Sequence, residues 1–292
     1  MEVDRRTLMK GMLAGVALSA FGFPPWTLAN PPARRPRHCL LLLGGTGADD
    51  MFASGARAAC SGRTYDGLQT VTMKGGLLTS TDRMVNLLAQ TRGARWIAVM
   101  DDASAVIFLE LARTAGVRLL SMGTHACSTD SSCQHRHAWA TTSPAHSPAG
   151  LLASQLVEGE GSFSITESFL YQPLEAGAVT SWSAPGFSSY RFPEPEAFHI
   201  HCSGLSLSKG CELVGLAESE RCIPIPPQVC GYESLRSQST NWMESLGYAV
   251  TASALGVDSV RESCSGRAFA HQSRNSKRIQ PTERFVSFVI DI

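Results

Sequence analysis

The chain has 292 residues, of which 43% are hydrophobic and 17% are charged, values typical of a folded globular protein. Its 25 lysines and arginines balance its 25 aspartates and glutamates, so the formal net charge is zero. This balance excludes a broad basic surface for nucleic acid or anionic lipid, and it also excludes a strongly acidic chain.

The first 29 residues have the organisation of an export signal. A basic segment is followed by an apolar stretch at residues 11–23 and by Thr27-Leu28-Ala29, a small-residue cleavage site. A bilayer core requires about 20 apolar residues, so this stretch predicts a processed signal and no permanent membrane insertion. We therefore assign residues 1–29 to the signal peptide and residues 30–292 to the mature protein.

The basic segment Asp4-Arg5-Arg6-Thr7-Leu8-Met9-Lys10 resembles the twin-arginine (Tat) export signal. The alternative is an ordinary Sec signal that happens to carry two arginines. The Tat resemblance implies a periplasmic protein and the Tat translocase as a partner during export. Tat carries folded proteins, often with a cofactor already inserted, so the resemblance also implies a cofactor or a metal.

Strands and helices alternate through the first half of the mature chain. The continuous apolar run at 39–43 is typical of a strand buried on both faces. The alternation predicts right-handed βαβ units and an α/β lobe at residues 30–160 with a Rossmann-like or periplasmic-binding-protein-like parallel sheet and flanking helices. The predicted strands are 39–43, 68–73, 96–100, 117–122 and 137–142, and three predicted helices are 49–60, 103–115 and 148–157. A further helix is expected after a cap at Thr79 or Ser80, with Met84, Val85, Leu87 and Leu88 on one face.

The second half, residues 161–292, is less regular and predicts a second α+β lobe. Four prolines and four aromatic residues at 172–197 indicate a long connection or lid. Further along, the pattern predicts a helix at 233–246 closed by Gly247, a strand at 248–252 and a closing strand at 285–290.

The first predicted strand runs into Gly45-Thr46-Gly47, the setting of a dinucleotide-binding turn. The third glycine of that motif is replaced by Asp50, whose carboxylate would repel a pyrophosphate. We therefore favour a tight strand-to-helix turn over a nucleotide site.

Paired carboxylates follow two of the predicted strands, at Asp49-Asp50 and at Asp101-Asp102. Ligands of open α/β sheets bind at the carboxyl ends of the strands, so these groups could hold a cation or an amine. Aspartate also caps helix N-termini without any ligand, and we favour that interpretation, with Asp101 the first candidate for a further role.

The densest group of soft ligands lies in a Ser/Thr-rich stretch. Thiolate and imidazole are preferred donors for zinc and copper, so this group predicts a metal site. A Cys127–Cys133 disulfide is the alternative, and the oxidising periplasm favours it. The candidate ligands are His125, Cys127, Cys133, His135, His137 and His146. A smaller cluster, His199-Ile200-His201-Cys202, would place both histidines on one face if it formed a strand.

All nine cysteines lie in the mature part, and their odd number leaves at least one outside any pairing in an oxidising compartment. They are Cys39, Cys60, Cys127, Cys133, Cys202, Cys211, Cys222, Cys230 and Cys264.

Residues 39–158 resemble the N-terminal lobe of type I periplasmic solute-binding proteins. The similar segments are a first strand that leads into Thr46-Gly47, the helix Gly55-Ala56-x-Ala58-Ala59, and the segments 96–99, 117–121 and 139–144. The resemblance implies two lobes that close on a small solute. The residues implied to contact this solute are Thr46, Asp101, Asp102 and Thr124.

The sequence thus favours an exported ligand-binding protein. A periplasmic metal-dependent enzyme or metal-carrying accessory protein that uses residues 125–146 is the alternative, and a partner-binding factor without a small ligand is the third possibility. No G-x-S-x-G, H-E-x-x-H or papain-like cysteine motif occurs, so the sequence predicts no catalytic residue.

Overall fold

The structure is a computed structural model, and every structural statement below concerns the residues that it describes. These are residues 38–61, 68–73, 77–79, 81–127, 135–159, 161–170, 186–192, 198–216, 222–226, 241–256, 264–273 and 282–292. The predicted signal peptide and Cys133 lie outside them. All of the described residues belong to one compact unit, Pro36–Ile292.

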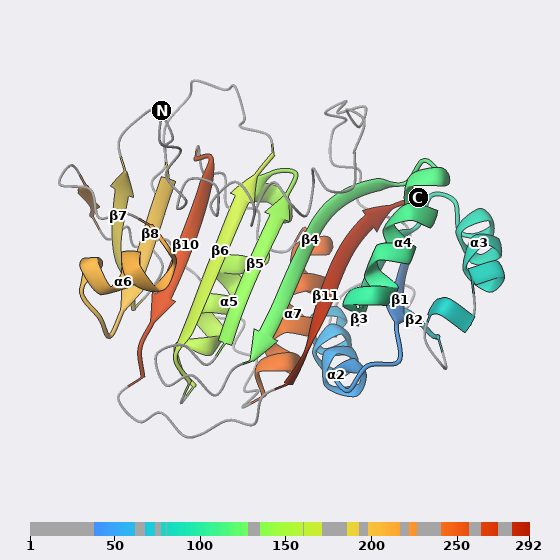
Figure 1. Ribbon diagram of the computed structural model, residues 1–292, viewed down its shortest axis with the longest axis horizontal. Coiled ribbons are helices and arrows are strands. Elements are labelled where there is room, and N and C mark those ends of the chain that lie inside the picture. The colour runs from blue at the N-terminus through green and yellow to red at the C-terminus, as the bar shows by residue number, and fades with distance from the viewer. Residues whose placement is uncertain are drawn as a thin grey trace, which may run out of the picture. The chain divides into compact units, whose positions relative to one another are not determined.

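The described strands form one sheet of 11 strands in the order β2-β1-β3-β11-β4-β5-β6-β10-β8-β7-β9 (Figure 1). Four strand pairs, β1–β2, β1–β3, β5–β6 and β8–β10, are parallel, and the other six are antiparallel. The strands are β1 (Cys39–Leu43), β2 (Leu68–Thr72), β3 (Arg95–Asp101), β4 (Arg118–Cys127), β5 (His135–Thr141), β6 (Phe163–Phe169), β7 (Ser188–Phe192), β8 (Phe198–Ser203), β9 (Ile223–Ile225), β10 (Gly266–His271) and β11 (Thr282–Asp291).

Helices cover both faces of this sheet. The described helices are α2 (Asp49–Cys60), α3 (Thr81–Gln90), α4 (Asp102–Thr114), α5 (Ala149–Leu156), α6 (Leu207–Leu213) and α7 (Trp242–Ala254), with short 3₁₀ turns η1 (Leu77–Thr79) and η2 (Pro144–His146). Within the described part of the chain, no helix has both the length and the apolar character that a membrane crossing requires.

The predicted α/β class is confirmed, but the predicted parallel sheet is correct only in part. The closing strand β11 was expected from its apolar residues, yet it inserts antiparallel between β3 and β4. An apolar run shows that a strand is buried but does not show its direction or its neighbours.

The sheet is continuous across residue 160, where the sequence predicts a boundary between two lobes. Strand β5 pairs with β6 along its whole length, and β10 lies between β6 and β8. The structure therefore has one sheet where two lobes were expected. Part of the expected connection at 172–197 is strand β7, and residues 171–185 and 193–197 lie outside the described residues.

The C-terminal helix differs from its prediction. Helix α7 runs through Gly247, and the expected strand at 248–252 is part of this helix. Gly247 packs against helix α2, since a Cβ atom there would lie 2.1 Å from the Phe52 carbonyl oxygen. From Ser245 to Ala254 every residue of α7 is buried, so this part of the helix lacks the helical period of apolar residues that would have revealed it.

Gly55 and Gly247 allow α2 and α7 to cross closely. A Cβ at Gly55 would lie 1.9 Å from the Glu244 carbonyl oxygen, so we expect Gly55→Ala and Gly247→Ala each to lower the free energy of unfolding by about 1–3 kcal/mol. Urea unfolding followed by circular dichroism measures this. Gly47→Ala is the matched control because a Cβ there has no atom within 4 Å. Equal stability of all three variants would contradict the close crossing.

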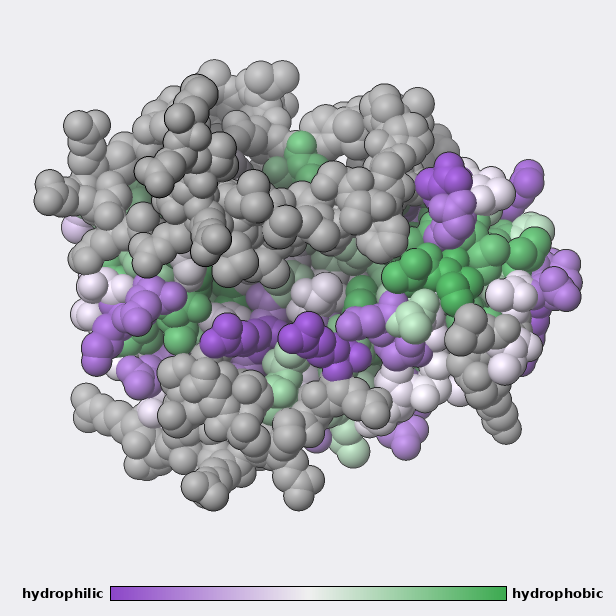
Figure 2. All heavy atoms as spheres, viewed as in Figure 1, coloured by the Kyte–Doolittle hydropathy of each residue, from purple (hydrophilic) through white to green (hydrophobic). Residues whose placement is uncertain are grey.

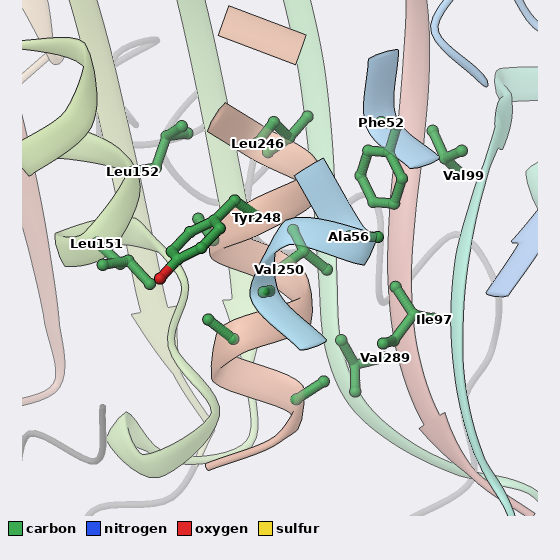
Figure 3. Close-up of a cluster of buried hydrophobic side chains, with 14 of the residues drawn as sticks. Phe52, Ala56, Ile97, Val99, Leu151, Leu152, Leu246, Tyr248, Val250 and Val289 are labelled. Atoms are coloured by element: carbon green, nitrogen blue, oxygen red, sulfur yellow. The ribbon is translucent and has the colours of Figure 1, made fainter. Parts of the chain in front are cut away.

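The main core lies between the sheet and helices α2, α5 and α7, on what we call the α7 face (Figure 3). Phe52 and Ala56 of α2 and Leu246 of α7 meet the sheet there (Figure 3). The opposite face, the α4 face, carries α4 at one end and α6 at the other (Figure 1). On it, the Phe108 ring of α4 stacks 6.4 Å from the ring of Trp96.

The α4 face is polar across its middle and apolar toward the end at which α4 lies (Figure 2). Val106 of α4 is 45% exposed. The predicted site residues that the structure describes lie on the α7 face, with the exception of Thr124 and of the residues in the turns that precede α2 and α4.

Candidate functional site

The turn after β1 is closed by Asp49. Its carboxylate accepts hydrogen bonds from the Gly45 N–H at 2.8 Å and from the Thr46 N–H at 3.1 Å and the Thr46 hydroxyl at 2.6 Å. The backbone N–H groups that would bind a phosphate are therefore already occupied by a side chain. This geometry confirms the tight strand-to-helix turn that the sequence favours.

Asp101 is the N-cap of α4, as favoured above, and its carboxylate accepts the Ser104 N–H at 2.9 Å. Burial acts to raise the pKa of Asp101, but the hydrogen bonds from Ser104 and the backbone outweigh it and hold that pKa below the usual value. Asp102 and Thr124 are both exposed. Thr124 lies on the α4 face of β4, two strands away from β3.

The four residues implied to bind a solute are thus at the ends of β1 and β3 and on β4. Thr46 and Asp101 hold the turns in which they lie. A shared solute site among these residues stays a prediction.

Four of the six predicted metal ligands lie together on the α7 face, at directly paired positions of two adjacent strands. His125 of β4 pairs with His137 of β5, and Cys127 pairs with His135. Alternate residues of a strand point to the same face, so the four side chains form a square on the sheet. All four are buried, between 1% and 6% exposed. We call these residues, His125, Cys127, His135 and His137, the His–Cys quartet.

A chain of close contacts joins two of these histidines to Ser287 of β11. His125 Nδ1 lies 3.1 Å from His137 Nδ1, and His125 Nε2 lies 2.8 Å from Ser287 Oγ. The rings of His135 and His137 are stacked with their centroids 6.4 Å apart.

Aromatic residues enclose the quartet. Trp242, the first residue of α7, places its ring 5.2 Å from that of His135 and 5.5 Å from that of His137. The Phe285 ring lies 5.2 Å from the ring of His125. The N-terminus of α7, capped by Asn241, therefore packs against the quartet and keeps it from bulk solvent.

Burial keeps these imidazoles neutral. It lowers the pKa of His125 to about 3 and the pKa of His135 to about 4. The pKa of His137 is lowered well below 6.5 by burial first, and then by His125 and His135. Each ring therefore keeps a lone pair at neutral pH that can bind a metal or accept a hydrogen bond.

The other two predicted ligands are not part of this square. His146 lies in η2, where burial lowers its pKa to about 4, with smaller effects from Arg95, Asp291 and Arg118. Asp291, a charged neighbour of His146, and Phe285, a neighbour of His125, both belong to β11. They are six residues apart along this strand, which is about 20 Å at about 3.3 Å per residue. Placing His146 with the other candidates was therefore wrong, and Cys133 lies outside the described residues.

As the side chains stand, no three His, Cys, Asp or Glu residues of the described ranges have donors gathered for one metal ion. No two cysteines of these ranges are joined by a disulfide. The Cys127–Cys133 disulfide stays a prediction because Cys133 is not described.

The segment that contains His199 and His201 is strand β8, and both histidines are fully buried on its α7 face. His201 Nδ1 lies 2.8 Å from Ser189 Oγ, and its ring stacks 4.6 Å from the Phe269 ring. Strands β6 and β10 separate β8 from β5, so this pair is about 14 Å from the quartet.

Sequence reasoning missed a buried ion pair on the same face. The Glu167 carboxylate accepts hydrogen bonds from Arg267 Nε at 3.1 Å, from the Thr141 hydroxyl at 2.9 Å and from the Ser147 hydroxyl. Arg267 is also packed against the ring of Phe169, 5.6 Å from its centroid. The available signal was a charged residue at a position of β6 that alternation assigns to the apolar side.

The contacts of Ser287, His125 and His137 have the spacing of a nucleophile, a base and an orienting residue. Ser287 is only 1% exposed, so a substrate carbonyl cannot reach its hydroxyl in this conformation. The arrangement therefore does not support acyl transfer, and metal binding is the chemistry that buried neutral imidazoles and a cysteine on one face favour.

Comparison of the chain with protein-family models, with curated proteins and with solved structures finds no match.

Proposed function

We propose that the chain is an exported protein that binds a transition metal ion, zinc or copper, at the His–Cys quartet. The observation that carries the proposal is the placement of the quartet on one buried face of two paired strands. Opposite residues of such strands have Cβ atoms about 4.5–5.5 Å apart, and diagonal neighbours are within reach of long side chains.

The donor set suits these metals. Imidazole nitrogens and a thiolate are donors that zinc prefers, and a thiolate also suits copper(I). Burial supports the proposal because it keeps the imidazoles unprotonated at neutral pH.

The route of export is consistent with such a buried site. An ion can reach the quartet most readily while the chain folds, because aromatic side chains of α7 and β11 enclose it afterwards. The Tat pathway, which the Arg5-Arg6 signal resembles, exports proteins after folding. Metal would therefore be inserted in the cytoplasm, before export.

The solute-binding alternative has less support. The carboxylates of Asp49 and Asp101 are already hydrogen-bonded within the turns that begin α2 and α4.

Metal content tests the proposal directly. We expect protein purified from the periplasm to contain about one zinc or copper ion per chain by plasma mass spectrometry, and we expect His137→Ala to lose it. His146→Gln is the control because His146 is a partly buried histidine whose charged neighbours, Arg95 and Asp291, lie at the other end of β11 from the quartet. A metal-free wild-type protein that also takes up neither Zn²⁺ nor Co²⁺ in titrations would overturn the proposal.

Export is tested separately. Replacing Arg5 and Arg6 together by lysine should retain the precursor in the cytoplasm, because an ammonium group does not reproduce the planar guanidinium that Tat recognition requires. Fractionation followed by immunoblotting measures this, with the Lys10→Arg variant as a control that keeps the pair. Export of the double variant at the wild-type level would contradict Tat routing.

A further inference from the structure

We propose that His137 binds the metal through Nε2, and that His125 and Ser287 are positioning residues that hold the His137 ring in place. This inference rests on the proposed function for the identity of the ligand, although the contacts that link His137, His125 and Ser287 exist without a metal.

The hydrogen-bond partners of His125 and His137 show which of the two rings has a nitrogen available to a metal. Both nitrogens of His125 have partners, His137 on one side and Ser287 on the other. His137 has a partner at Nδ1, but its Nε2 has none among the described residues, although the side chain is only 3% exposed. Buried polar atoms are nearly always paired, and His137 Nε2 is one of several buried atoms of the described residues without a partner. Of the four nitrogens of His125 and His137, it is the one left available to a ligand.

The protons can then take only one arrangement. A metal requires the lone pair of His137 Nε2, so the proton of this ring must be on Nδ1, which donates to His125 Nδ1. The His125 proton must in turn be on Nε2, which donates to Ser287 Oγ at 2.8 Å. A metal-binding histidine commonly donates its second N–H to such an acceptor, which fixes the ring and makes the ligating nitrogen more basic.

Packing also fixes the orientation of the His125 ring. Its ring lies between those of Trp139 and Phe285, with centroids at 5.0 and 5.2 Å. A turn of the ring that freed a nitrogen for the metal would break the contact with Ser287 or with His137. The inference therefore separates His125 from the other residues of the quartet and adds Ser287, which the sequence did not single out.

The first arm of the test measures Zn²⁺ affinity by competition with a chelator, and coordination from the visible spectrum of the Co²⁺ form. We expect His137→Ala to abolish binding. We expect Ser287→Ala and His125→Ala to weaken it about 10- to 100-fold while the Co²⁺ spectrum keeps its coordination number. Ser287→Thr, which retains the hydroxyl, should bind nearly as the wild type does. Loss of a ligand from the spectrum of His125→Ala, or wild-type affinity in Ser287→Ala, would overturn the inference.

The second arm uses the metal-free wild-type protein, so it does not depend on whether variants fold. Nitrogen-15 chemical shifts of the imidazoles should show the proton of His137 on Nδ1 and the proton of His125 on Nε2. A proton on His137 Nε2 would overturn the inference. If these tautomers are found but no metal binds, the proposed function fails together with the ligand role of His137. Only the hydrogen-bonded series His137, His125 and Ser287 then remains.

Discussion

Lowering the pH from 6.5 to 4.5 should remove most of the stability of the metal-free protein. Burial depresses the folded-state pKa of several histidines below the value of 6.5 that they have when unfolded. The unfolded state therefore binds protons first as the pH falls. The stabilisation is complete above pH 6.5 and is lost progressively toward the folded pKa values of about 3 for His125 and about 4 for His135 and His146.

The expected size follows from the same linkage. Each such histidine lowers the free energy of unfolding by about 1.4 kcal/mol for every pH unit below 6.5. Three of them therefore lower it by about 8 kcal/mol over two pH units, which is comparable to the total stability of a typical domain. Urea unfolding curves at several pH values measure this. His146→Gln should make the slope shallower without a change in the quartet, because it removes one of the titrating histidines. The depressed pKa values of Asp101 and Asp291 act in a different window, below their ordinary 3.8. A flat profile between pH 6.5 and 4.5 would show that these histidines are not buried as neutral groups.

Replacing Arg267 by methionine should destabilise the protein by about 3–5 kcal/mol, because it leaves the Glu167 carboxylate charged and without its cation in the core. The two side chains are 1% and 2% exposed, and the arginine also packs against two aromatic rings. Adding Glu167→Gln to this variant should restore part of the loss, since it removes the uncompensated charge.

The matched control is Arg113→Met, which breaks an ion pair with Glu110 that lies in solvent. We expect no measurable change there, because exposed pairs contribute little. Both variants are compared with the wild type in urea at pH 7. A loss in Arg267→Met no larger than in Arg113→Met would contradict a structural role for the buried pair.

The residues of the candidate site were only partly predictable. The sequence identified the four members of the quartet because imidazole and thiol groups are dense there. It also grouped His146 with them, since nearness in sequence was the only measure of distance available. Ser287 was not recognised because it is 162 residues away from His125 along the chain and a single serine carries no signal.

The sequence alone determined the local elements whose causes are local. The apolar run Cys39–Leu43, the aspartate that begins α4 and Gly116, which ends α4 with a φ of 70°, each identify a strand or a helix boundary through short-range contacts. Only the tertiary structure decided where β11 inserts, and that the segment after Gly247 is helical. Those outcomes depend on which surfaces meet, and a strand or helix buried on all sides has no periodic pattern to record its neighbours.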